Sequence, residues 1–517
     1  MFIMTISALI LFYVAYLIYN WIVWMRKFDQ YPSYSLSPSQ CIFALKEIIK
    51  GPEYILKNYT SKTYIKYIHQ FIKHQDYIVL WITFYPILFV LKSNCIEDSL
   101  KKHNVKTSFT QAFKPFLSDG LVLKNGERWK KFRKIGEMNL KTKMLSSFIP
   151  TMSKHGNTFI TKLYSKTDSW VDLQKNLSLT TFNVISECAM GISTESDNLQ
   201  NDAETLFSLA PDAPAYAIKR LFNPLLWPEF IYLGYCDYAT SGKIKVCSTL
   251  FKHLVNKEIS RQQIYYVNDI DHSDEEKEEI FLDKIRDNYL SHLVSLYIDG
   301  LNGNDDEIPI EDIEYEINNF IIAGFETVKV SVLWTLACIA SEPEIQERIY
   351  REINDVLDDD GYDIEKLNQL TYLDCCVREG LRLFPPIFST GRTSQTDGAF
   401  AGRLLPKSTE IITIIWAVHH DETIYPEPEK YDPDRFSSER VESIPSSAWI
   451  PFGFGPRTCI GYRFALCEAK LLISLIIKHF TIQTNKFYDQ IDFTAVITLK
   501  PIEPMLFKFT PRGQILL

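Results

Sequence analysis

The chain opens on its longest uncharged stretch. Residues 2–25 carry no Asp, Glu, Lys or Arg, and Arg26 and Lys27 follow directly. A run of about 24 residues is long enough for a helix that spans a bilayer, and interfacial aromatic residues lie near its end, at Tyr19, Trp21 and Trp24. Basic residues tend to stay on the cytosolic side. We therefore predict a single-pass anchor over 1–27, a linker over 28–40 and a cytosolic folded body over 41–517.

A cleaved signal peptide is the alternative interpretation of this N-terminal stretch. The apolar core of a signal peptide is about 7–15 residues long and precedes a cleavage site between small residues. The uncharged run here is longer, and no such site follows it. The sequence therefore favours the anchor.

The hydrophobic pattern of the body is mainly helical. Residues 77–91 form a second apolar run, but it is short and contains Pro86, so we expect two buried strands joined at a turn. Helical periodicity covers residues 151–191, 203–257 with prolines in its middle, 311–340, 343–357, 372–383 and 461–480. Residues 268–279 are acidic and are expected to form a solvated loop, and short strands are expected after Pro385. The predicted fold class is mainly α with a smaller β region (α+β).

Composition narrows the class of protein. The 517 residues are 46% hydrophobic, enough for a large core, and the net charge of −9 argues against general nucleic-acid binding. The ten cysteines show no CxxC pair. We expect buried free thiols in a reducing compartment, with the exception of Cys459.

Cys459 lies in the most specific segment of the chain, residues 451–461, PFGFGPRTCIG. Glycines at 453, 455 and 461 permit turns that aim backbone N–H groups at a sulfur ligand. The helix that begins after Cys459 adds its positive end, which favours a thiolate. The alternative is a buried cysteine in a glycine-rich turn.

The pattern FxxGxRxCxG in this loop resembles the haem-binding loop of cytochromes P450. The resemblance implies the P450 fold and a haem b that is bound non-covalently, apart from a Cys459 thiolate as axial ligand of the iron. Such a ligand favours cleavage of the O–O bond. It also implies contacts to the cofactor from Phe452, Gly455 and Arg457, with Arg457 neutralising a haem propionate.

Three further residues resemble the structural network of that family. Glu379 and Arg382 stand three residues apart on one helical face, and Arg435 lies in the segment Pro433-Asp434-Arg435-Phe436. The first pair alone is typical of a solvated face. The resemblance implies a buried, fully paired network with a structural role.

Residues 323–327, AGFET, resemble the oxygen-binding segment of the family. The resemblance implies that Gly324 leaves room for dioxygen, that Thr327 donates a hydrogen bond during oxygen activation and that Glu326 relays protons. The alternative is a helix that tolerates a glycine and exposes one acid.

Three other residues resemble those that bind the haem propionates. Trp129 and Arg133 match a WxxxR helix and lie about one turn apart, and Arg392 matches a third propionate ligand. Lys130, Lys131 and Lys134 form a basic patch on the same helix. This patch is a candidate docking site for an acidic electron donor, or simply a solvated face.

The segment 217–235 is rich in large apolar residues, including Trp227 and Phe230. In the resembled family this region lies over the active site. A second membrane contact with a substrate entrance, and ordinary core packing, explain the pattern equally well.

Several long segments, among them 120–134, 372–386 and 417–436, look most like the animal microsomal branch that includes fatty-acid ω-hydroxylases, with the drug- and steroid-oxidising branch close behind. Many ω-hydroxylases carry a glutamate that bonds covalently to the haem where this chain has Ala323. We therefore expect no ester link, and ω-regioselectivity does not follow from the resemblance.

The resemblance implies a monooxygenase of the endoplasmic reticulum membrane that uses O₂ and acts on a lipophilic small molecule. No nicotinamide or flavin domain is visible, so electrons would come from NADPH–cytochrome P450 reductase, with cytochrome b5 as a further candidate partner. A haem-thiolate isomerase or dehydratase of lipid peroxides, and a non-catalytic haem or lipid binder, are the competing functions.

Overall fold

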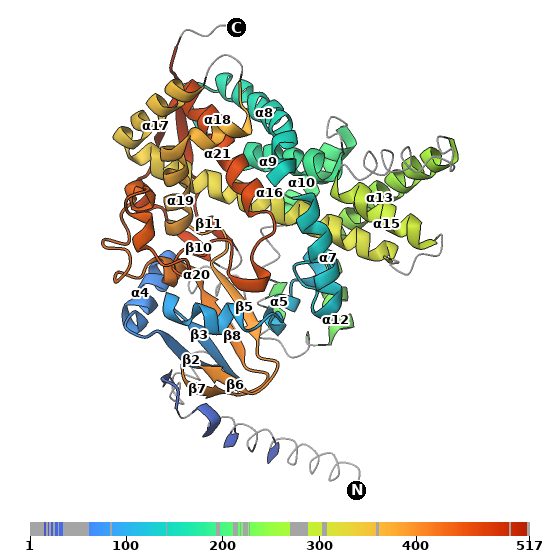
Figure 1. Cartoon of the computed structure of the whole chain (residues 1–517), viewed down its shortest axis with the longest axis vertical. Coiled ribbons are helices and arrows are strands. Elements are labelled where there is room, and N and C mark those ends of the chain that lie inside the picture. Colours follow the sequence, from blue (N-terminus) through green and yellow to red (C-terminus); the bar gives the residue numbers. More distant parts are fainter. Residues whose placement is uncertain are drawn as a thin grey trace. The chain divides into compact units, whose positions relative to one another are not determined.

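The structure is a computed structural model. It describes residues 15–16, 19, 22–23, 26–28, 30–34, 61–82, 85–140, 142–192, 197–209, 216–217, 219–220, 226, 228–268, 288–301, 308–357, 361–495 and 498–513. The chain forms two compact units (Figure 1). The smaller unit comprises residues 1–108, 387–428 and 443–458, and the larger unit comprises residues 109–386, 429–442 and 459–517.

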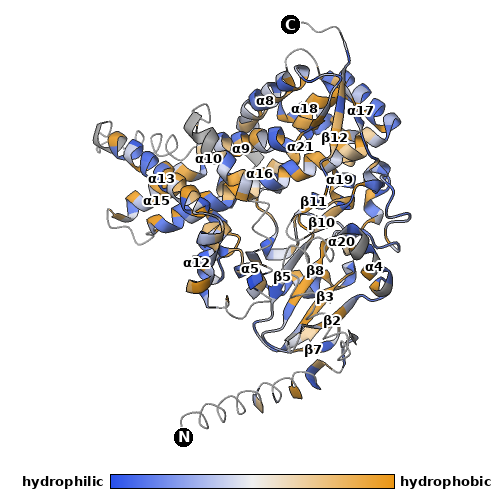
Figure 2. Cartoon of the chain, turned by 180° about the vertical axis from the view of Figure 1, so that it is seen from behind, coloured by the Kyte–Doolittle hydropathy of each residue, from blue (hydrophilic) through white to orange (hydrophobic). Residues whose placement is uncertain are grey.

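A five-stranded mixed sheet forms the centre of the smaller unit. Its order is β1–β2–β3–β8–β5, with β1 Ser33–Tyr34, β2 Tyr77–Ile82, β3 Tyr85–Val90, β8 Glu410–Ile414 and β5 Ser389–Thr393. Strands β2 and β3 pair antiparallel, β3 runs parallel to β8, and β5 runs antiparallel to β8. Figure 2 shows that β2, β3 and β8 are largely hydrophobic, and one core cluster contains Val79, Leu88 and Ile411.

The apolar run at 77–91 therefore forms two strands, as the sequence predicts. The β2–β3 register places Trp81 opposite Pro86, so the proline lies near the turn of the hairpin. A second hairpin and short helices complete the smaller unit: β6 Gly398–Phe400, β7 Arg403–Leu405, α4 Lys62–Ile72, α20 Ile415–His419, η1 Ser93–Cys95, η2 Glu97–Lys101 and η6 Gly455–Arg457.

The larger unit is mainly helical. Its helices are α6 Lys114–Leu117, α7 Gly126–Asn139, α8 Thr142–Tyr164, α9 Gln174–Met190, α10 Asp197–Leu209, α12 Glu229–Ala239, α13 Lys243–Asn268, α15 Tyr289–Leu301, α16 Ile310–Ser341, α17 Pro343–Val356, α18 Ile364–Gln369, α19 Thr371–Leu383 and α21 Tyr462–His479. The short α5 Ser108–Gln111 and η5 Val441–Ser443 each contain a point of the sequence at which one unit ends and the other begins, and η4 Pro433–Phe436 and η7 Tyr488–Gln490 belong to the larger unit. Two small sheets, β4–β12–β9 and β10–β11, belong to the larger unit, with β4 Trp170–Asp172, β9 Phe480–Thr484, β10 Phe493–Ala495, β11 Leu499–Pro501 and β12 Leu506–Pro511.

The helices predicted near residues 311–340, 343–357, 372–383 and 461–480 are all present. The expected helix over 151–191 is wrong in one respect, because strand β4 separates α8 from α9. Three residues of β4 pair with β12, which comes more than three hundred residues later. A pattern within one segment cannot reveal such a pairing. Of the predicted loop at 268–279, all but Asn268 lies outside the described residues.

Helix α16 is the central helix of the larger unit. It begins after Pro309 with Glu311 and Asp312 in its first turn, where negative charge stabilises a helix, and it ends before Pro343. Among the described residues it is the one helix apolar and long enough to cross a membrane. Because 72% of its apolar window is buried inside the fold, it is packed as a core helix.

Most of the predicted anchor over 1–27 lies outside the described residues. The residues of this stretch that the structure describes are helical, and Tyr16, Tyr19 and Ile22 among them are exposed. The segment that follows is not a free tether, because Phe28 and Tyr31 are buried in the core of the smaller unit. The predicted linker over 28–40 thus begins with residues that belong to the fold.

Candidate functional site

The loop before Cys459 is built from tight turns in the smaller unit. Gly453 and Gly455 have φ values of +76° and +74°, which favour glycine. A Cβ on Gly455 would lie 2.7 Å from the carbonyl oxygen of Leu100, so no side chain fits there. Arg457 Nε donates to the carbonyl of Asn104 at 2.8 Å. Phe452 is half-buried and meets Trp449 edge to face.

Cys459 itself belongs to the larger unit and stands three residues before α21. It is exposed, whereas the other eight described cysteines are all buried, as the sequence predicts. Desolvation raises the pKa of its thiol, while the backbone N–H of Gly461 and the positive charge of Arg133 lower that pKa. Desolvation is the largest of these effects, so the pKa of the thiol stays above its usual value, and the N–H of Gly461 and the charge of Arg133 partly offset it.

Helix α7 brings the predicted Trp129–Arg133 pair next to the cysteine. Trp129 is buried, and the Arg133 guanidinium lies 5.8 Å from its ring centre. A Cβ on Gly136 would meet the side chain of Ile460 at 2.8 Å, so α7 packs directly against the residue that follows Cys459. Arg133 also binds Glu137 at 2.7 Å. The structure therefore joins α7 and the start of α21 into one local site.

One stripe of α16 is left open by the surrounding protein. Ala323 is exposed, and Thr327 and Ser331 are half-buried at intervals of one turn, although most of the helix is buried. The Thr327 hydroxyl donates to the Ala323 carbonyl at 2.7 Å, and Ser331 Oγ donates to the Thr327 carbonyl at 2.8 Å. The open stripe is therefore lined by small and hydroxyl-bearing residues.

Gly324 faces α9 and not the open stripe of α16. A Cβ at this position would lie 2.6 Å from Ile185 of α9. In this structure the glycine serves the close packing of α9 against α16, and Ala323 and Thr327 carry the open stripe instead. The role expected for Gly324, leaving room for dioxygen, stays a prediction.

Glu326 is buried and paired. Its carboxylate binds Lys329 one turn away and Lys500 of β11, the latter at 3.5 Å. Burial alone would raise the pKa of Glu326, but the charges of Lys329 and Lys500 outweigh it and leave the pKa below its usual value. The alternative of an exposed acid on a helix surface is therefore wrong.

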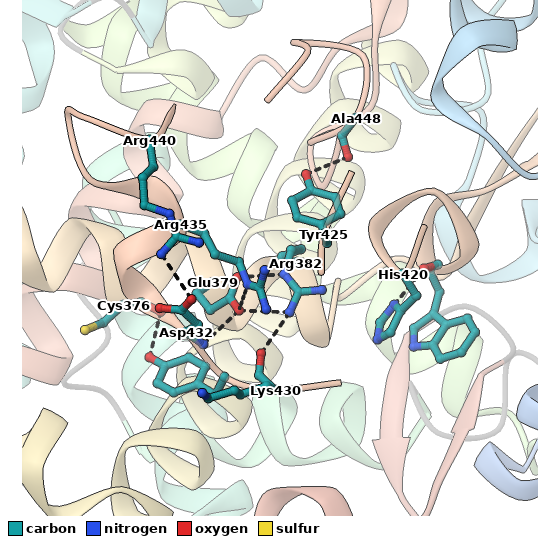
Figure 3. A network of polar contacts seen from close by, with 12 residues as sticks. Cys376, Glu379, Arg382, His420, Tyr425, Lys430, Asp432, Arg435, Arg440 and Ala448 are labelled. Atoms are coloured by element: carbon teal, nitrogen blue, oxygen red, sulfur yellow. Dashed lines mark hydrogen bonds and ion pairs between the residues drawn. The ribbon is translucent and has the colours of Figure 1, made fainter. Parts of the chain in front are cut away.

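Glu379, Arg382 and Arg435 form one buried network in the larger unit (Figure 3). Arg382 binds the two carboxylate oxygens of Glu379 at 2.6 and 2.8 Å, and Arg435 Nε lies 3.3 Å from Oε1. The backbone N–H of Asp432 donates to the same oxygen at 3.0 Å, and Arg382 also donates to the carbonyl of Lys430 at 3.2 Å. Helix α19 is thereby tied to the segment that contains η4.

A cluster of cations gathers in the smaller unit. Arg392 on β5 is almost fully buried, and its Nε has no hydrogen-bond partner among the described residues. Desolvation lowers the pKa of Arg392 to about 10. Burial, followed by the charges of Arg392 and Arg457, lowers the pKa of Lys106 well below its usual range. A buried arginine with an unused donor, next to two half-buried cations, fits an anionic partner such as a carboxylate-bearing cofactor.

Lys106 was missed by the sequence analysis. It follows the irregular segment after η2, and no local pattern distinguishes it from other surface lysines. Only the packing of that segment beside Arg392 and Arg457 reveals its place in the cluster.

The larger unit carries two candidate interaction surfaces, the basic patch of α7 and the apolar residues of α12. On α7, Lys130 and Lys134 are exposed and Lys131 is half-buried, and Lys130 pairs with Glu127 at 2.7 Å. On α12, Phe230 and Tyr238 are 78% and 85% exposed, and Ile231 and Leu233 are also exposed, while Tyr232 is buried. Part of the 217–235 segment, including Trp227, lies outside the described residues. The described part is exposed rather than core on this face of α12.

Comparisons with known proteins show the family of the chain. The profile of the family described as Cytochrome P450 matches residues 54–509. The chain is 26% identical to "Cytochrome P450 4V2" of Homo sapiens over 87% of this chain and 85% of that protein. It is 26% identical to "Probable cytochrome P450 4ac2" of Drosophila melanogaster over 92% and 91%. It is 31% identical to "Cytochrome P450 4F12" of Homo sapiens over 72% and 70%.

The buried network makes a prediction about stability. Glu379→Ala leaves two buried guanidinium groups without their carboxylate, which is expected to cost about 3–5 kcal/mol of unfolding free energy. The measurement is urea unfolding followed by circular dichroism. Arg440→Ala is the control, because Arg440 forms a half-exposed pair with Asp432 at 3.2 Å, and such pairs contribute about 0–1 kcal/mol. Equal losses in the two variants would contradict a special role for Glu379.

Proposed function

The chain belongs to the cytochrome P450 family, and from this premise we propose that Cys459 is the axial ligand of its haem and that its substrate is a fatty acid, a steroid or a xenobiotic. The family binds haem b through a cysteine thiolate, and its members are monooxygenases acting on lipophilic compounds. The observation that carries the proposal is the state of Cys459, which is exposed beside Arg133 and Gly461.

The resemblance to the family gives each predicted residue its own task toward the haem. In the larger unit, Cys459 would bind the iron, and Trp129 and Arg133 would donate hydrogen bonds to a propionate. In the smaller unit, Arg392, Arg457 and Lys106 would supply positive charge to propionates, and Phe452 and Gly455 would shape the loop. When bound, the haem supplies the activation of O₂ for the reaction RH + O₂ + NADPH + H⁺ → ROH + H₂O + NADP⁺.

The remaining proposed roles belong to helices of the larger unit. Thr327 would present its hydroxyl on the open stripe of α16, and Glu326 would supply protons once released from its lysine partners. Glu379, Arg382 and Arg435 would hold α19 and the segment around η4 in place without taking part in chemistry. Ala323 cannot form the ester link that a glutamate forms, so the haem would be held without that bond.

The monooxygenase function is favoured over the two competing functions. A lipid-peroxide isomerase needs no external protons or electrons, whereas this chain retains Thr327 beside an acid. A non-catalytic binder would not need that pair either. Turnover that depends on NADPH and a reductase separates the three functions.

The nature of the iron ligand can be tested directly. The reduced protein with CO is expected to show the long-wavelength Soret band of thiolate ligation, and Cys459→His is expected to lose it because imidazole replaces the thiolate. The difference spectrum of the purified proteins measures this. Cys467→Ala, at a buried cysteine of α21, should keep the band. A band that survives Cys459→His, or a wild type that binds no haem, would overturn the proposal.

We further propose that the basic patch of α7 docks NADPH–cytochrome P450 reductase, or cytochrome b5, at the cytosolic face of the endoplasmic reticulum. Lys130→Glu with Lys131→Glu is expected to slow reduction by the reductase several-fold at low salt and less at high salt, because the attraction is electrostatic. Stopped-flow reduction under CO measures the rate. Lys175→Glu, at an exposed lysine of α9 paired with Glu204, is the control. An unchanged rate in the double variant would reject the docking site.

The exposed face of α12 supports a second contact with the membrane. In a chain that lacks residues 1–27, Phe230→Ser with Tyr238→Ser is expected to reduce binding to phospholipid vesicles, because two large apolar side chains are lost. Co-sedimentation measures the bound fraction. Trp170→Ser is a suitable control, since Trp170 is an exposed aromatic residue of β4. If vesicle binding is the same with and without the α12 substitutions, the proposed membrane contact of α12 is rejected.

A further inference from the structure

The first half of α16 carries a row of buried polar side chains. Asp312, Glu316 and Asn319 lie about one turn apart on one face of the helix, and the open stripe of α16 continues the same row. A polar group inside a protein must find a partner. All three find one in residues 116–128, the segment that leads into α7 and forms its first turn.

Two cations of this segment bind the row of α16 in register. Arg128 Nη2, in the first turn of α7, donates to Asp312 Oδ1 at 2.5 Å. Lys124 Nζ lies 2.8 Å from Glu316 Oε1, one turn further along α16, and 3.4 Å from Asp312. The side chain of Lys124 is 1% exposed. Buried charges of this kind are stable only when they are paired, so a displacement of α7 along α16 would leave charges unpaired.

A tight turn before Lys124 holds the segment against the next turn of α16. The backbone N–H of Val122 donates to Asn319 Oδ1 at 3.0 Å. A Cβ on Gly120 would lie 2.4 Å from the side chain of Asn319, so no side chain fits there. The N–H groups of Leu123 and Lys124 both donate to the carbonyl of Gly120 at 2.9 Å. The backbone that carries Lys124 is thereby fixed on α16.

Lys124 also contacts α7 directly. Its Nζ lies 4.4 Å from the ring centre of Phe132, which is buried one turn after Arg128. Trp129 and Arg133 follow Arg128 and Phe132 in the sequence of the same helix. Because a helix moves as one body, the contacts of Lys124 and Arg128 also set the places of Trp129 and Arg133.

We propose that Lys124, assisted by Arg128, is a positioning residue that fixes the register of α7 along α16 and thereby places the propionate donors of α7. This inference rests on the proposed haem contacts of Trp129 and Arg133. It adds that a buried lysine outside α7 controls how tightly these donors hold the haem. The competing explanation is a network that stabilises the fold and has no effect on the haem.

Transfer of haem to apomyoglobin measures how tightly the donors hold it. In the full-length ferric protein, Lys124→Met is expected to speed the transfer several-fold, because the ammonium group that joins the segment to α16 is lost. In a variant that already carries Trp129→Phe and Arg133→Ala, the same substitution should add little, since the donors are gone. An unchanged rate, or an equal acceleration in both backgrounds, would overturn the proposal.

The propionate bending bands of the resonance Raman spectrum give a second readout, which a purely stabilising network would not change. Lys124→Met is expected to shift these bands in the same direction as Arg133→Ala. Bands that shift in Arg133→Ala and stay in place in Lys124→Met would reject the inference alone. If Arg133→Ala changes neither the bands nor the haem transfer, its proposed propionate contact is wrong, and the inference falls with it.

A milder variant keeps the test valid if Lys124→Met does not fold. Arg128→Gln removes the pair with Asp312 from a side chain that is 58% exposed, and it is expected to speed haem transfer to a smaller extent. Arg348→Gln is the matched control, because the side chain of Arg348 is 55% exposed and pairs with Asp434 at 3.0 Å on another part of the larger unit. Equal transfer rates in the two variants would overturn the proposal.

Discussion

The carboxylate of Glu379 is shared by two buried guanidinium groups, and much of the larger unit depends on this interaction. Charges of this kind are tolerated inside a protein only when every one of them is paired. Here the backbone N–H of Asp432 and the carbonyl of Lys430 complete the pairing. The network therefore fixes α19 relative to η4, and any displacement of either would expose an unpaired charge to the core.

The same helix α19 sets the position of α16. Gly380, next to Glu379, meets Thr335 of α16 so closely that a Cβ would lie 2.4 Å from its hydroxyl oxygen. Gly324 allows a similar approach of α9 on another side of α16. Close helix packing on these sides leaves the stripe of Ala323 and Thr327 as the part of the central helix that remains open. The helix that carries the buried network thereby packs directly against the helix that carries the residues proposed to act in catalysis.

Helix α16 is apolar enough to look like a membrane span, yet several of its buried polar residues bind groups on other parts of the larger unit. Glu316 and Asp312 bind Lys124, at 2.8 and 3.4 Å, and Tyr289 donates to Glu316. Asn318 donates to the carbonyl of Phe116 at 3.0 Å. Glu326 binds β11. These bonds attach neighbouring segments of the larger unit to the central helix, and they explain why the polar residues are tolerated in its core.

The sequence alone determined the features that depend on neighbours within a few turns. Apolar periodicity located α16, α17, α19 and α21, the run at 77–91 predicted the β2–β3 hairpin, and the spacing of Glu379 and Arg382 placed both on one helical face. The glycines and Arg457 around Cys459 were enough to predict the loop that precedes this cysteine. Tertiary structure decided what depends on segments far apart: the pairing of β4 with β12, the burial of Phe28 and Tyr31, the side that Gly324 faces, and the meeting of Lys106 with Arg392 and of Lys500 with Glu326. The physical reason is that helix and strand patterns report which side of an element is buried, whereas the identity of the group across the interface is set by packing between elements that no local pattern records.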